Sequence, residues 1–223
     1  MWPVIYDFGI IRFLGFEFHL AIYSYGFMLV VAFYTCYALL LKEMRRLSYG
    51  DKLASDILTA AAIGGIVGSK IYYLLENFDR VLGDPTGMIF SGAGLVFLGG
   101  LMGGTLGVTI VLKKNDLPWL TFADIVAPLL ILGYAIGRVG CFLVGDDYGL
   151  PTKFLIGMTF ENGAPPTTYG SFTYNYPWVD LSGWNSGDVI TVFPTQIMET
   201  IIGLGIFYFL WNKRETIQVK GSL

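Results

Sequence analysis

The chain has 223 residues, of which 54% are hydrophobic and only 14% are charged, with a mean hydropathy of +0.61. These values are too apolar for a soluble domain of this length and predict an integral membrane protein. The net charge of −3 without a basic stripe excludes nucleic acid as an expected partner. A single histidine and no cysteine cluster argue against a zinc or haem site, so we expect no metal and no cofactor.

The N-terminus lacks the basic region of a signal peptide, and Asp7, Arg12 and Glu17 interrupt its apolar stretch. We therefore expect the first membrane helix to be retained. Cys36 and Cys141 both lie in apolar runs, which does not suggest a disulfide framework.

Five segments are long and apolar enough to cross a bilayer, which takes about 20 helical residues. Their ranges are 20–41, 56–75, 93–112, 122–144 and 194–212. The fold class predicted is thus an all-α polytopic membrane protein with about five transmembrane helices, in which residues 1–223 form a single integral membrane domain.

Lysines and arginines alternate between the two sides of the predicted membrane domain. Nine lie in the loops after the first and third spans and in the C-terminal tail: Lys42, Arg45, Arg46, Lys52, Lys113, Lys114, Lys213, Arg214 and Lys220. The opposite side has three: Arg12, Arg80 and Lys153. The positive-inside rule then puts the N-terminus outside and the C-terminus in the cytoplasm.

This orientation makes the connection over residues 146–192 extracytoplasmic. It is the one predicted loop large enough for a small subdomain. Its glycine, proline, tyrosine and tryptophan content predicts strand, turn and interfacial loop rather than helix.

An arginine lies within the apolar run that ends at Gly145. Residues 137–149 read Gly-Arg-Val-Gly-Cys-Phe-Leu-Val-Gly-Asp-Asp-Tyr-Gly. An arginine at membrane depth costs about 2.5–3.5 kcal/mol on insertion scales, so Arg138 is expected to face a partner, water or a ligand. The alternative is a helix end from which the arginine snorkels to the interface.

Other polar residues of the spans are few. Lys70 has no obvious route to the interface and needs an acid or a lipid phosphate. Gln196 and Glu199 are three residues apart and share a helix face at the outer boundary, where Glu199 is predicted to pair with Arg138 in one cavity. Capping and interfacial solvation are the alternative for this pair. Tyr25 fits an aromatic belt or a head-group contact equally well.

Glycines spaced by four residues occur in the second and third spans. Gly64 and Gly68 form one such pair, and Gly99, Gly103 and Gly107 form a series. Small residues at this spacing predict close packing of membrane helices.

These motifs together resemble the prolipoprotein diacylglyceryl transferase family of the bacterial inner membrane. The resemblance runs in order over residues 1–212 and is most specific at Gly137–Gly149, which is similar to the signature Gly-Arg-x-Gly-Asn-Phe-x-Asn-Gly-Glu-x-x-Gly. Its other segments are Ile22–Gly26, Gly68–Tyr73, Val96–Gly100, Gly163–Thr167 and Phe193–Glu199.

The resemblance implies a multi-pass membrane enzyme. Such an enzyme moves diacylglyceryl from phosphatidylglycerol to the thiol of a lipobox cysteine in a preprolipoprotein and releases glycerol phosphate. It also implies catalytic roles for Arg138, which would clamp the lipid phosphate, for Tyr25 of the first motif and for Asp146 at the signature glutamate. Lipid binding is expected of Lys70, Gly137, Gly140, Gly149, Gln196 and Glu199.

Several family residues are replaced in this sequence. Leu98 stands at the family's histidine or tyrosine, Cys141 and Val144 stand at two asparagines, and Phe193 and Met198 stand at a histidine and a tyrosine. The family also continues into a further membrane helix carrying Tyr-Gly-x-x-Arg, so the resemblance is to a diverged member with a short C-terminus.

Two functions therefore stay open. One is a diverged transferase that uses phosphatidylglycerol, or another anionic phospholipid, and a lipobox peptide. The other is a catalytically inactive lipid-binding subunit of a larger membrane complex. A transporter or channel has little support, because no inverted repeat is visible.

Overall fold

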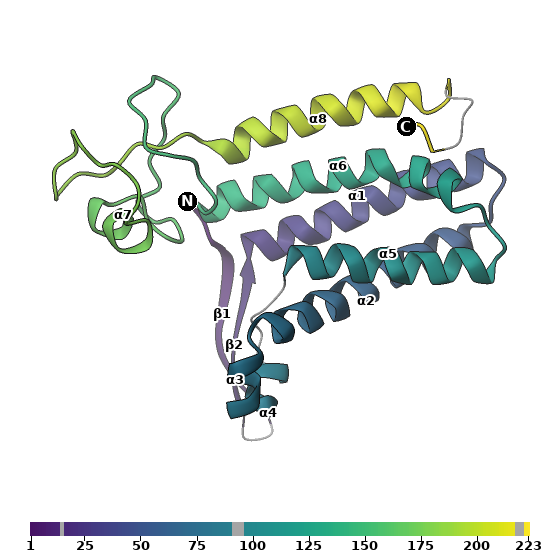
Figure 1. The fold of residues 1–223 in the computed structure, drawn as a ribbon, viewed down its shortest axis with the longest axis horizontal. Helices are drawn as coiled ribbons and strands as arrows, with labels where there is room; N and C mark the ends of the chain where they lie inside the picture. The colour runs from purple at the N-terminus through teal and green to yellow at the C-terminus, as the bar shows by residue number, and fades with distance from the viewer. Residues whose placement is uncertain (14–15, 91–95, 217–220) are drawn as a thin grey trace. The chain divides into compact units, whose positions relative to one another are not determined.

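The computed structural model describes residues 1–13, 16–90, 96–216 and 221–223. Its elements in chain order are β1 (Val4–Phe13), β2 (Phe16–Tyr23), α1 (Ser24–Arg46), α2 (Asp51–Glu76), α3 (Phe78–Gly83), α4 (Pro85–Phe90), α5 (Phe97–Lys114), α6 (Trp119–Val144), α7 (Tyr169–Asn175) and α8 (Thr195–Lys213) (Figure 1). The protein is mostly helical, as the sequence predicts.

The described chain divides into two compact units. The first contains Met1–Cys36 and Ala127–Thr216, and the second contains Tyr37–Val126 and Ile217–Leu223. The predicted functional residues other than Lys70 all belong to the first unit.

Four helices in the described part of the chain are long and apolar enough to cross a membrane: α1, α2, α5 and α6. They correspond to the first four predicted spans, although residues 93–95 of the third lie outside the described residues. The fifth predicted span forms α8, which is not among the four. The direction in which the helices cross the membrane stays a prediction.

The N-terminal residues differ from the all-α prediction. β1 and β2 form an antiparallel hairpin that pairs Tyr6 with Ile22 and Ile10 with His19. The first predicted span accordingly begins too early, because residues 20–23 complete β2 and α1 starts at Ser24. Aromatic and β-branched residues make up most of β1 and half of β2, which favours a strand over a helix.

In the second unit, α2 and α5 pack closely along their glycines. A Cβ atom added at Gly64 would lie 2.3 Å from the carbonyl oxygen of Gly103, and one added at Gly68 would lie 2.3 Å from that of Gly99. One added at Gly107 would lie 2.5 Å from the carbonyl oxygen of Ala60. The predicted packing of the two glycine patterns is confirmed.

Residues 146–192 contain a small hydrophobic core of their own, made by Phe160, Phe172, Ile190 and Val192. Isolated β-bridges join Val192 to both Pro151 and Met158, and another joins Thr168 to Val189. These bridges agree with the predicted strand and turn structure. The sequence did not predict α7, whose N-terminus is capped by the Thr168 hydroxyl, which accepts from the Ser171 amide. Whether this region is an extracytoplasmic subdomain stays a prediction.

Replacing Gly103 with alanine should destabilise the second unit. The new Cβ would lie 2.1 Å from the carbonyl oxygen of Gly64, so the two helices would have to separate. Overpacking of this kind costs about 1–3 kcal/mol, and we expect a lower thermal transition of the detergent-solubilised protein. Gly205→Ala is the matched control, because a Cβ there meets nothing within 4 Å. Equal transitions for the two variants would contradict the packing described.

Candidate functional site

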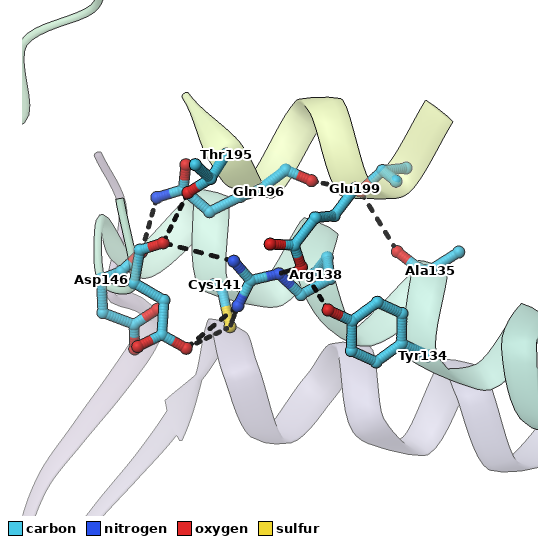
Figure 2. A network of polar contacts seen from close by, with 10 residues as sticks. Tyr134, Ala135, Arg138, Cys141, Asp146, Thr195, Gln196 and Glu199 are labelled. Atoms are coloured by element: carbon cyan, nitrogen blue, oxygen red, sulfur yellow. Dashed lines mark hydrogen bonds and ion pairs between the residues drawn. The ribbon is translucent and has the colours of Figure 1, made fainter. Parts of the chain in front are cut away.

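Two helices of the first unit bring the candidate site together. Ala135 and Arg138 lie in the second half of α6, and α8 begins at Thr195. A Cβ at Gly203 would lie 3.1 Å from the Ala135 Cβ, and the Thr200 hydroxyl donates to the Ala135 carbonyl at 3.3 Å. The glycine thus allows α8 to approach α6, and Figure 2 shows the Arg138 side chain reaching from α6 toward Glu199 of α8.

The Arg138 guanidinium is bound by acidic groups on two of its edges. Its Nε lies 2.8 Å from Glu199 Oε2, so the predicted ion pair is present. Its Nη1 donates to Asp147 Oδ2 at 3.0 Å, and its Nη2 donates to the Asp147 main-chain oxygen at 3.2 Å. Only 11% of the Arg138 side chain is exposed, whereas 38% of Glu199 and 68% of Asp147 are. A nearly buried charge is therefore compensated by two more accessible acids.

Glu199 is held in place from a second side. The Tyr134 hydroxyl donates to Glu199 Oε2, the same oxygen that faces Arg138 (Figure 2). Tyr134 lies four residues before Arg138, so both side chains project from one face of α6. The carboxylate is thereby fixed between a phenol and a guanidinium.

The turn after α6 is tied to the start of α8. The Gln196 side chain is fully buried and donates from Nε2 to the Asp146 main-chain oxygen at 2.5 Å. The Thr195 hydroxyl donates to the Asp147 main-chain oxygen at 2.8 Å. Asp147 itself has φ +50°, a left-handed conformation that aspartate tolerates better than most residues. The turn that carries both acids is therefore held by two side chains of α8.

Asp146 points its carboxylate into partly buried surroundings. Burial raises the pKa of this carboxyl group, a hydrogen bond from Cys141 lowers it, and the neighbouring Asp147 raises it further. Among the described residues, its Oδ1 atom is buried and has no hydrogen-bond partner. A carboxylate with a raised pKa and an unused acceptor is suited to accept a proton.

Cys141, Asp146 and Asp147 place one potential ligand atom each within 4.8 Å of one another. Arg138 Nη1 already lies 3.0 Å from Asp147 Oδ2 and 3.7 Å from Cys141 Sγ. The guanidinium supplies the positive charge that a cation would bring, so the arrangement fits an anion at Arg138 better than a metal ion.

The three predicted glycines of the first unit differ in how closely other residues pack against them. Gly140 packs against α1, since a Cβ there would lie 3.2 Å from Tyr25 Cδ2 and 3.2 Å from Met28 Cβ. Gly149 packs against Thr195 and donates its amide to the Phe193 oxygen at 2.8 Å. A Cβ at Gly137 would meet nothing within 4 Å. Contact with lipid at these glycines stays a prediction, as does the role of Tyr25.

Lys70 lies on α2 in the second unit. Its Nζ lies 5.3 Å from the centre of the Tyr73 ring, which is within the range of a cation–π contact. Its predicted role in lipid binding stays a prediction.

A family model described as prolipoprotein diacylglyceryl transferase matches residues 13–223. The chain belongs to this family.

Named relatives agree with the match. A phosphatidylglycerol–prolipoprotein diacylglyceryl transferase of Clostridium tetani is 31% identical over 199 residues, covering 89% of this chain and 72% of the relative. A second enzyme of this name, from Clostridium perfringens, is 33% identical over 204 residues, which cover 89% of this chain and 70% of the relative. A third, from Leptospira interrogans, is 27% identical over 221 residues, which cover 87% of this chain and 64% of the relative.

Two residues of the site, Tyr134 and Asp147, were not predicted from the sequence. Tyr134 could have been found from its spacing of four residues before Arg138, which places it on the same helix face. The contact of Asp147 does not follow from the sequence, because the turn that folds this residue back onto Arg138 has no periodicity.

Glu199→Gln should lower the stability of the protein. The substitution keeps the shape and an acceptor for Tyr134 but removes the charge opposite the buried Nε of Arg138. We expect the free energy of unfolding to fall by about 1–3 kcal/mol, a value between those for exposed and buried ion pairs. Thermal unfolding in detergent measures it. Glu161→Gln, at an exposed position of the same unit, is the control. A transition unchanged from the unsubstituted protein would mean that Asp147 alone compensates Arg138.

Proposed function

We propose that the protein transfers diacylglyceryl from phosphatidylglycerol to the thiol of a lipobox cysteine in a preprolipoprotein. Family membership supports the reaction class, and the relatives are named for this reaction. The single observation that carries the proposal is the nearly buried guanidinium of Arg138, held beside a partly buried carboxylate, in a member of this family.

In this reaction the thiol sulfur attacks the glyceryl carbon bonded to the phosphate oxygen. The carbon–oxygen bond breaks, a carbon–sulfur bond forms, and glycerol phosphate leaves with an additional negative charge. Arg138 would stabilise that charge, since a preorganised cation in a low-dielectric site contributes most where charge develops. The planar fork of its Nη1 and Nη2 atoms suits two phosphate oxygens.

Asp146 would accept the thiol proton. Its pKa is raised and so lies nearer to the pKa of a thiol than the pKa of an ordinary aspartate does. Its Oδ1 atom accepts no hydrogen bond from the described residues. Tyr25 would border the site from α1, and Gln196 would hold the turn that carries Asp146.

The reaction also fits the proposed placement of the protein. We propose that it lies in the bacterial inner membrane with its N-terminus outside, its C-terminus in the cytoplasm and residues 146–192 as a small extracytoplasmic region. The lipid would enter from the bilayer, and the peptide would approach from outside.

Arg138→Ala should abolish transfer, and Arg138→Lys should reduce it by about 10²-fold or more, because lysine keeps the charge but loses the fork. The measurement is transfer of labelled diacylglyceryl to a lipobox peptide by purified protein in phosphatidylglycerol micelles. Arg80→Ala, at an exposed arginine of α3, is the control and should keep full transfer.

No transfer by the unsubstituted protein, when it is folded and binds phosphatidylglycerol, would contradict the proposed enzyme. Purification in a fixed ratio with other membrane proteins would then support a lipid-binding subunit.

The pH dependence of transfer should show the raised pKa of Asp146. A base is lost when pH falls through its pKa, so the acid limb of kcat/KM should lie at a higher pH than an ordinary aspartate gives. Asp146→Asn should remove most of the transfer. Asp180→Asn is the control, since hydrogen bonds from Ser182 lower the pKa of that exposed carboxyl group and its loss should not move the limb. An acid limb at the ordinary aspartate pKa would assign the base elsewhere.

A further inference from the structure

Asp147 occupies the edge of Arg138 that a phosphate would use. The end of the guanidinium, formed by Nη1 and Nη2, is bound by the Asp147 carboxylate on one nitrogen and by the Asp147 main-chain oxygen on the other. A phosphate group also presents two oxygens to such a fork. The lipid phosphate and the Asp147 carboxylate therefore compete for Nη1. Nη2 carries two N–H groups, so one can contact a phosphate oxygen while the Asp147 main-chain oxygen keeps the other.

The two acids that bind Arg138 differ in how firmly they are held. Glu199 lies on the regular helix α8 and is fixed by the Tyr134 hydroxyl. The Asp147 side chain is 68% exposed and lies in the turn after α6. Water can solvate an exposed carboxylate once it leaves its partner, so the Asp147 carboxylate is the one that can be displaced.

The main chain of Asp147 stays in place when its carboxylate leaves. The Thr195 hydroxyl donates to the Asp147 carbonyl oxygen at 2.8 Å, and that oxygen also accepts from Nη2. Rotation about the side-chain bonds is then sufficient to free Nη1. A phosphate oxygen would take the place of Oδ2, 3.0 Å from Nη1.

We propose that Asp147 is a displaceable counter-ion of Arg138 that sets the affinity of this site for anionic phospholipid. It compensates the guanidinium when no lipid is bound and yields Nη1 to the lipid phosphate. Glu199 stays on Nε throughout and keeps the guanidinium oriented. This inference rests on the proposed function, because it takes the phosphate to bind at Arg138.

Asp147→Asn tests the inference without disturbing the turn. Asparagine tolerates the left-handed conformation at φ +50° as aspartate does, and it keeps an oxygen that can accept from Nη1. Only the competing charge is lost. We expect phosphatidylglycerol to bind about two- to fivefold more tightly, in line with the strength of an exposed ion pair.

The experiment measures two quantities for the purified full chain in nanodiscs or mixed micelles. The first is the dissociation constant for phosphatidylglycerol, with phosphatidylcholine as the zwitterionic comparison. The second is KM for phosphatidylglycerol in the transfer assay. Glu161→Gln removes one exposed charge from the same unit and should change neither.

Tighter binding of phosphatidylglycerol by Asp147→Asn, together with a lower KM, supports the inference. Tighter binding in a protein that shows no transfer would refute the proposed enzyme and still support the counter-ion. Unchanged or weaker binding by Asp147→Asn overturns the inference whether or not transfer occurs, because Asp147 would then position Arg138 instead of competing for it. An equally large increase in affinity for phosphatidylcholine, whose net charge is zero, overturns it as well.

Discussion

The positive charge of Arg138 near the end of an apolar helix is the constraint on which the site depends. At the centre of a membrane helix such a charge costs about 2.5–3.5 kcal/mol, and a buried charge nearer the end still needs a partner. Glu199 supplies one negative charge from α8, and Asp147 supplies another from the turn after α6. Three separate parts of the chain must therefore meet at one guanidinium, and the close approach of α8 at Gly203 makes this possible.

The turn after α6 links this site to the hydrophobic core of residues 146–192. Tyr148 stacks on Phe160 with ring centres 5.5 Å apart, and its hydroxyl donates to the Pro165 oxygen at 2.9 Å. Asp146 and Asp147 lie just before this anchored tyrosine, and their main-chain oxygens accept from α8. The main chain of the turn is thus held on both sides, while the Asp147 carboxylate remains exposed. A fixed main chain with one accessible charged group suits a site that must exchange one anion for another.

The sequence predicts much of this arrangement, since its strongest signals are simple. Long apolar runs located the membrane helices to within a few residues, and glycine spacing predicted the packing of α2 on α5. The Arg138–Glu199 pair followed from two opposite charges at one membrane boundary. The end of the hairpin was missed because its last residues, 20–23, are apolar and lead directly into the first span, and the contact of Asp147 depends on a left-handed turn that no periodicity encodes.

The most direct test of the account is an experimental structure with bound phosphatidylglycerol or an ether-linked analogue of it. We expect a phosphate oxygen on Nη1 of Arg138, the Asp147 carboxylate turned away, and Glu199 still on Nε. A lipid phosphate bound elsewhere, with the contact between Arg138 and the Asp147 carboxylate intact, would contradict it.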